Sequence, residues 1–305
     1  MSADQLKQDR SRSSGPFQYY ADHSAMSDPG RRRSLFARLP DDIRSLASIV
    51  ADLGIYDVVA KDFYACDLGA ARKSEIHIRS LEKRLDRIVE LDGRPLSARR
   101  EVDNRIAGRC NSFTLTLVGI LRHKGIPARS RCGFGGYFNP PRYEDHWVCE
   151  YWNAEQRRWM LVDAQLDAVW RRKLRLSFDP CDVPRDQFLT AADAWQRYRR
   201  GVADPEKFGI SFAGLFGRWF MASSVVRDFA ALNKVETLPW DVWGAQPRPD
   251  ATFDDHKLAY FDRLAALAAD PDANFAGLRR HYEDDEPVRA PAAVFNALLQ
   301  QQEAL

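Results

Sequence analysis

Long apolar runs are missing from this 305-residue sequence. No stretch approaches the roughly 18 consecutive apolar residues that a membrane-spanning helix needs. The polar N-terminal segment, rich in Ser, Asp and Arg, also lacks the apolar part of a signal peptide. We therefore expect a disordered leader over residues 1–34, no membrane partner and a cytoplasmic location.

An excess of one charge is missing as well. The chain has 45 basic and 43 acidic residues and a formal net charge of +2. Proteins whose main partner is nucleic acid or an anionic membrane usually carry a clear basic excess. The balance gives no reason to expect nucleic acid as a partner, and it leaves the oligomeric state open.

Cysteine pairs at metal-binding spacing are absent. The five cysteines include no C-x-x-C pair, so neither a zinc knuckle nor a thioredoxin-like site is indicated. No run of acidic residues is similar to a dedicated calcium loop. We predict no metal and no cofactor, and we expect the thiols to be reduced in the cytoplasm.

What the sequence does contain is enough apolar material for a large core, with 45% hydrophobic and 11% aromatic residues. Helical periodicity predicts helices that begin after Asp42 and at 76, 97 and 110, the last of these running past Leu121. Alternating residues predict strands that end near Phe134, over 146–152 and over 158–163, with a Gly/Pro-rich loop over 135–141. Further helices are expected over 191–200, 217–232, 255–269, 274–282 and 291–301.

This order predicts an α+β fold in which a central helix packs on an antiparallel sheet, with added helices around it. We expect a catalytic domain over residues 35–250 and a helical C-terminal extension over residues 251–305. The composition of residues 239–244, Pro-Trp-Asp-Val-Trp-Gly, is unusual, and docking of the C-terminal helices would explain it.

Cys110 begins the central helix, directly after Gly108 and Arg109. A thiol is a good nucleophile only as the thiolate, so its pKa of about 8.5 has to be lowered by a positive field. The N-terminus of a helix supplies such a field through its unpaired N–H groups and its dipole. Cys110 is therefore the candidate nucleophile, although a lone cysteine is more often a buried packing residue.

A thiolate needs an imidazole partner, and the imidazole needs an acceptor that fixes its orientation. His146 starts a predicted strand, and Asp163 ends the next strand of the same hairpin. In an antiparallel hairpin the start of one strand lies beside the end of the next. The topology therefore predicts that His146 and Asp163 are neighbours.

Three segments of the chain resemble the transglutaminase-like superfamily, in the order Cys, His, Asp. They are Gly108–Phe113 with Gly125–Arg129, Asp145–Tyr151, and Arg158–Asp163. The resemblance covers roughly residues 106–166 and implies a papain-like fold with a triad of Cys110, His146 and Asp163. Within the superfamily, the Gly-Arg-Cys segment and the Asp-His and Arg-Trp segments are somewhat similar to the core of peptide N-glycanases.

Two departures from known branches of the family concern metals and the nucleophile. Peptide N-glycanases carry paired C-x-x-C zinc motifs, which this chain lacks. Animal transglutaminases have Gln-Cys-Trp at the nucleophile, whereas this chain has Arg109-Cys110-Asn111. The resemblance therefore indicates the superfamily rather than one activity.

Other residues near these motifs have competing interpretations. Asn104 is a candidate oxyanion donor beside the backbone N–H of Cys110, or else a residue on a helix surface. Trp147 is a candidate for lining the substrate cleft, with core packing as the alternative. His123 and Asp167 are rivals to His146 and Asp163; we interpret His123 as structural and place Asp167 beyond the strand end. Asp145 is expected to face solvent.

The sequence thus predicts a cysteine enzyme that cleaves or transfers an acyl group at an amide or a thioester of a peptide or small molecule. Water as acceptor gives hydrolysis and an amine gives transfer, and the residues do not decide between a protease or amidase and an acyltransferase. The alternative is a non-catalytic binding module that keeps the fold.

Overall fold

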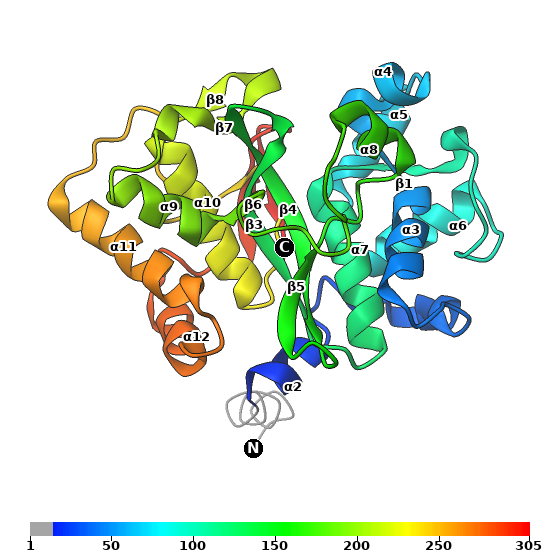
Figure 1. The fold of residues 1–305 in the computed structure, drawn as a ribbon, viewed down its shortest axis with the longest axis horizontal. Coiled ribbons are helices and arrows are strands. Elements are labelled where there is room, and N and C mark those ends of the chain that lie inside the picture. The colour runs from blue at the N-terminus through cyan, green and yellow to red at the C-terminus, as the bar shows by residue number, and fades with distance from the viewer. Residues whose placement is uncertain (1–14) are drawn as a thin grey trace.

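A central sheet separates two groups of helices in the computed structural model, which describes residues 15–305 (Figure 1). The sheet contains β3 (Ala128–Asn139), β4 (Arg142–Asn153), β5 (Arg158–Val162), β6 (Phe188–Thr190), β7 (Phe208–Ile210) and β8 (Leu215–Phe216). Its strand order is β6-β3-β4-β7-β8, with β5 also paired to β4. All pairs are antiparallel except β4 with β7.

Helix α7 (Cys110–His123) packs against β3 and β4 on one side of the sheet. Around it lie α3 (Ile43–Leu53), α4 (Ala60–Tyr64), α5 (Ala70–Lys73), α6 (Leu81–Leu91) and α8 (Ala168–Leu174). Short parallel strands β1 (Gly54–Tyr56) and β2 (Ile106–Gly108) lead into this group. Phe113 and Leu117 of α7 share a buried cluster with Leu46 of α3 and Leu85 of α6, so α7 is held rigidly from both sides.

The other side of the sheet is covered by α9 (Ala191–Arg199), α10 (Arg218–Leu232), α11 (Asp255–Ala269) and α12 (Phe275–Asp284) (Figure 1). α10 packs directly on β3. Its residues Val225 and Phe229 lie in one buried cluster with Phe261 of α11 and Leu278 of α12. The predicted α+β fold, with a central helix on a mostly antiparallel sheet, is therefore confirmed, and residues on both sides of position 250 share a core.

The end of the chain differs from the prediction. Residues 291–301 were expected to be helical, but the chain forms β10 (Ala293–Asn296) and β11 (Gln301–Ala304) there. In a separate sheet, β10 pairs with β11 on one side and with β9 (Asp241–Val242) on the other. Buried Asn296 fixes the turn, because its Oδ1 accepts hydrogen bonds from the backbone of Leu298 and Leu299. Tertiary pairing with β9 therefore overrides the local helical pattern.

The predicted disordered leader is wrong from residue 15 onward, while residues 1–14 lie outside the described part. Helix α2 (Pro16–Ala21) and a 3-10 helix over Gly30–Phe36 lie against the body of the protein. Tyr19 and Tyr20 are buried, and the Tyr20 hydroxyl donates to the Leu232 carbonyl at 3.0 Å. Two aromatic side chains are enough to anchor a segment whose overall composition is polar.

Three predicted elements have different boundaries in the structure. The helix expected from residue 76 is split, because Ser80 caps α6 and a separate 3-10 turn covers Ser74–His77. The helix expected over 97–106 is mostly irregular, with one 3-10 turn at Val102–Asn104. The loop expected over 135–141 is mainly strand, since β3 continues to Asn139 with a shifted register after Gly135.

Candidate functional site

Cys110 is the first residue of α7 and follows directly after β2 and Arg109. The residue before it, Arg109, provides no side-chain cap, so the N–H groups of the first turn are not covered by a capping oxygen. Cys110 is 4% exposed and shares a small buried cluster with Cys132, Trp147 and Ala231. A thiol at this place is held firmly and feels the positive end of a 14-residue helix.

His146 and Asp163 form a direct hydrogen bond, with 2.8 Å between His146 Nε2 and Asp163 Oδ2. The strand register explains this contact. Val162 of β5 lies opposite Cys149 of β4, so Asp163 falls opposite Val148, on the face that also carries His146. The neighbourhood that the sequence predicted for these two residues is present in the structure.

Asp163 is held by two further donors. The Tyr137 hydroxyl donates to Asp163 Oδ2 at 2.7 Å, and the backbone N–H of Gln165 donates to Oδ1 at 3.1 Å. The carboxylate is therefore fixed at both oxygens, and His146 is fixed through it. Because Nε2 faces Asp163, the other ring nitrogen, Nδ1, remains for a partner on the cavity side.

The protonation of His146 reflects two opposing effects. Burial alone lowers its pKa, because a charged imidazolium is costly away from water. The Asp163 carboxylate and, after it, the Cys110 thiol outweigh burial and raise the pKa of His146 to about 10. At neutral pH the ring is a cation beside Cys110, which is the state that a thiolate–imidazolium pair requires.

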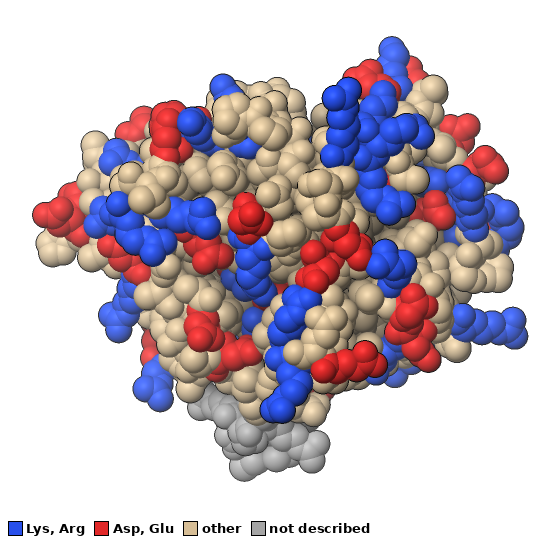
Figure 2. Space-filling model, in the orientation of Figure 1, with Lys and Arg blue, Asp and Glu red and all other residues tan. Residues whose placement is uncertain are grey.

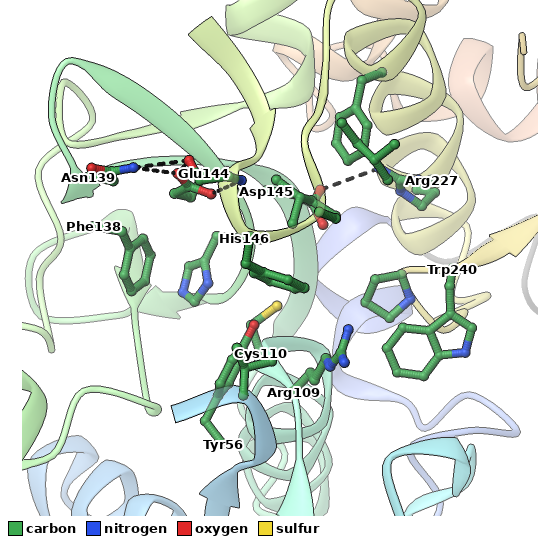
Figure 3. A pocket seen from close by; sticks show the side chains of 18 of the residues that line it. Tyr56, Arg109, Cys110, Phe138, Asn139, Glu144, Asp145, His146, Arg227 and Trp240 are labelled. Atoms are coloured by element: carbon green, nitrogen blue, oxygen red, sulfur yellow. Dashed lines mark hydrogen bonds and ion pairs between the residues drawn. The ribbon is translucent and has the colours of Figure 1, made fainter. Parts of the chain in front are cut away.

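Cys110 and His146 both line a cavity of about 560 Å³, shown in Figure 3. This volume is within the range of roughly 300–1,000 Å³ that small-molecule sites occupy. Figure 3 shows the His146 ring to the upper left of the Cys110 sulfur, the Phe138 ring beyond it, and the Tyr56 side chain below the sulfur. The centroids of the Phe138 and His146 rings are 4.7 Å apart, so Phe138 packs against the imidazole.

Tyr56 and Arg109 complete the immediate surroundings of the thiol. Tyr56 ends β1 and lies in register with Gly108, and burial, with the Cys110 charge adding to it, raises the pKa of Tyr56 well above 10. Its hydroxyl therefore stays protonated and can donate a hydrogen bond. Arg109 forms an ion pair with Asp57 at 3.0 Å and lies 5.1 Å from the ring centroid of Trp240.

The other four thiols are poor nucleophiles by comparison. All five cysteines are free and buried. Burial raises the pKa of Cys66 and Cys149, raises that of Cys132 well above its usual value, and raises that of Cys181 to about 11. Each of these four thiols therefore stays protonated at neutral pH.

The two minor candidates lie away from the cavity wall. Asn104 is in the 3-10 turn over Val102–Asn104, and Trp147 is 1% exposed in the cluster beneath Cys110. Neither is among the described residues that line the cavity around Cys110. Tyr56 lines the cavity instead, and its place in the sequence, 54 residues before Cys110, gave no signal of this.

The rival residues have other partners. His123 is exposed at the end of α7, and Asp167 caps α8 by accepting hydrogen bonds from the N–H groups of Val169 and Trp170. Asp145, expected to face solvent, instead has a buried side chain that pairs with Arg227 at 3.3 Å. Helix α10 brings Arg227 to this position, and a contact between such distant segments could not be read from the sequence.

The segment over residues 239–244 is a wall of the same cavity. Pro239, Trp240 and Val242 line it, and β9 within this segment pairs with β10. Residues 239–244 therefore both pair with the C-terminal strand β10 and line the cavity. Local composition alone does not indicate that this segment lies beside Cys110.

Residues 15–305 contain no group of three or more His, Cys, Asp or Glu side chains placed to hold a metal ion. Within the same range, no helix combines the length and the apolar character required to cross a bilayer.

Comparison with known proteins gives one family and one solved structure. Residues 72–164, which include Cys110, His146 and Asp163, match the family model of the "Transglutaminase-like superfamily". No curated protein matches the chain. A solved structure described as a "Putative Cysteine Protease from Cytophaga hutchinsonii" is 17% identical, with a TM-score of 0.35, and the match covers 59% of this chain and 50% of that chain.

Proposed function

Because residues 72–164 of this chain form a transglutaminase-like superfamily domain, we propose that the protein is a cysteine enzyme acting on an amide or a thioester. The observation that carries the proposal is the contact of His146 Nε2 with Asp163 at 2.8 Å, because His146 lines the same cavity as Cys110. A cationic imidazole fixed beside a thiol at a helix N-terminus is the arrangement of a nucleophilic thiolate.

In the proposed reaction the Cys110 thiolate attacks the acyl carbon of the substrate. Its sulfur forms a bond to that carbon, and the imidazolium of His146 gives its proton to the departing amine or thiol. The backbone N–H of Cys110 and the Tyr56 hydroxyl are positioned to donate to the oxyanion. Neutral His146 then takes a proton from the acceptor, which attacks the acyl-enzyme and releases the thiolate.

The acceptor determines the product. Water gives hydrolysis to the acid, and an amine gives a new amide. Both outcomes share the acyl-enzyme at Cys110, so the first experiment addresses that thiol. A binding module that only retains the fold would need no reactive cysteine.

We expect iodoacetamide to alkylate Cys110 with a pH midpoint well below 8.5. The rate at each pH is measured by mass spectrometry, with the other four cysteines as internal references. At pH 6.5 Cys110 should react at least tenfold faster than any of them. His146→Ala should shift the midpoint to that of an ordinary thiol and lower the rate of acylation by a substrate about 100-fold or more.

The matched control is His123→Ala, which removes an exposed imidazole from the far end of the same helix. This variant should keep the wild-type profile. If Cys110 of the wild type reacts with the pH midpoint of an ordinary thiol, the proposal of an enzyme is wrong. The protein is then better described as a binding module that keeps the fold.

A further inference from the structure

We propose that the cavity beside Cys110 binds the acyl part of the substrate as a bulky, apolar and uncharged group. This inference deepens the proposed function and rests on it, because the cavity matters for specificity only if Cys110 is acylated. It names the substrate class as amides or thioesters of medium-chain or aromatic acids, in preference to short or charged ones.

The wall of the cavity is mainly apolar. Large apolar side chains reach the cavity from segments far apart in the chain: Phe63 of α4, Trp170 of α8, Trp219 of α10 and Leu298 of the β10–β11 turn. The apolar face of one amphipathic helix would not bring together side chains from so many segments. A wall assembled from four elements points to a binding site whose occupant excludes water.

Exposed apolar side chains gather at this cavity. Among the described residues, eight large hydrophobic side chains are exposed, and five of them line this cavity. These five are Val58, Phe212, Leu215, Val242 and Leu298. Scattered exposed hydrophobics need no explanation, but five of them in the lining of one cavity mark a surface that an apolar ligand covers.

The charged side chains in the wall of the cavity are paired within the protein. Arg109 is paired with Asp57, and Asp145 is paired with Arg227. Glu144 accepts a hydrogen bond from the Ser211 backbone N–H at 2.9 Å and another from the Ser211 hydroxyl. Each of these charged groups already has a partner in the chain, so a charged ligand would have to displace one of them or lose its own hydration.

The main alternative is that the cavity binds a negatively charged ligand. Figure 2 shows Lys and Arg side chains gathered at the upper right, where Figure 1 places α8. Arg171, Arg172 and Lys173 of this helix are exposed, whereas its Trp170 and Leu174 line the cavity. The basic cluster therefore lies on the outer surface of α8, and the cavity receives its apolar side.

Binding can be tested without catalysis in Cys110→Ala protein by isothermal titration calorimetry. The probes are acetamide, hexanamide, adipamic acid and 6-aminohexanamide, of which the last two carry a terminal charge on a chain like that of hexanamide. Each methylene that leaves water should tighten binding by about fourfold. We therefore expect hexanamide to bind at least tenfold more tightly than acetamide, adipamic acid and 6-aminohexanamide.

Variants of exposed wall residues locate the binding. Leu298→Asp and Phe212→Asp, each in the Cys110→Ala protein, should weaken hexanamide binding at least fivefold. The matched control is Val202→Asp, because Val202 is 73% exposed and does not line the cavity. Far-ultraviolet circular dichroism and thermal melting check that each variant is folded, and Phe212→Ser provides a milder change at the same place.

Several outcomes overturn the inference. These are equal binding of acetamide and hexanamide, tighter binding of either charged probe, no binding of any probe, and an equal effect of Val202→Asp. None of them affects the alkylation result that tests the proposed function. Conversely, tight hexanamide binding with an ordinary Cys110 thiol would retain an apolar binding site and reject the enzyme.

Discussion

At the scale of single residues, His146 shows how burial and pairing compete. Burial favours the neutral imidazole, while Asp163 favours the charged form, and the pair with Asp163 prevails because the carboxylate lies only 2.8 Å from Nε2. The carboxylate is itself fixed by Tyr137 at 2.7 Å. His146 therefore owes its charge to Asp163 and Cys110, while Tyr137 fixes the position of Asp163.

The raised pKa of His146 predicts how stability depends on pH. The pKa is about 6.5 in the unfolded chain and about 10 in the folded protein. A group that is more basic when folded stabilises the folded state fully below pH 6.5, and this contribution is lost as the pH rises through 10. In Cys110→Ala protein this thiol does not titrate, and Asp163 remains as the group that raises the pKa of His146. We expect His146→Gln in that background to cost more near pH 6.5 than near pH 10.

Urea denaturation between pH 6.5 and 10 measures this difference in the free energy of unfolding. His123→Gln in the same background is the reference, since burial lowers the pKa of His123 and any effect of its titration falls below that range. A cost of His146→Gln that stays constant with pH would show that the ring is neutral in the folded protein.

At the scale of elements, the pairing of β3 with β6 depends on a glycine. Gly133 pairs with His146 on one side and with Thr190 of β6 on the other. A Cβ atom added at Gly133 would lie 2.2 Å from the Leu189 carbonyl oxygen and 2.9 Å from the Phe188 ring. The absence of a side chain therefore lets β6 cross close to the strand that aligns His146.

Replacing this glycine should separate β6 from β3. We expect Gly133→Ala to lower the free energy of unfolding by about 2–3 kcal/mol, because the neighbouring backbone must move. Gly69→Ala is the control, since nothing lies within 4 Å of the Cβ that it adds, and it should change stability by less than about 1 kcal/mol. Urea denaturation measures the free energy of unfolding of both variants. Equal effects of the two variants would contradict the close approach of β6 to Gly133.

At the scale of the whole molecule, buried charges join the sheet to the helices behind it. Asp228 of α10 accepts two hydrogen bonds from Arg131 of β3, at 3.0 and 2.9 Å, and one from the Cys132 backbone N–H at 2.9 Å. Glu150 of β4 accepts from Arg129 at 2.7 Å and from Arg131 at 3.0 Å. Removing the charge of Asp228 leaves buried Arg131 with Glu150 alone, which Arg129 shares, and this is far more costly than never having the pair.

We therefore expect Asp228→Asn to lower the free energy of unfolding at pH 7 by about 3–5 kcal/mol. The matched control is Asp182→Asn, which breaks the exposed pair with Arg158 and should cost less than about 1 kcal/mol. Thermal and urea unfolding of both variants measure the contrast. Similar small losses would mean that the apolar packing of α10 holds this side of the sheet without the ion pairs.

The sequence by itself determined the core of the protein. Local periodicity placed α3, α7 and the β4–β5 hairpin, because each buries one apolar face and so carries a regular pattern. The order of Cys110, His146 and Asp163 followed from motifs in or beside those same elements. Hairpin geometry alone was sufficient to bring His146 and Asp163 together.

Only the tertiary structure decided the surroundings of that core. Tyr137 contacts Asp163 because β3 continues past a shift in register. Trp240 lines the cavity because β9 pairs with β10. Tyr20 holds α2 in place because its side chain inserts into the core. Periodicity reports which face of an element is buried, but it does not report which distant element covers that face. Contacts between segments separated by tens to hundreds of residues therefore determine the cavity, while the local pattern determines the helix that carries Cys110.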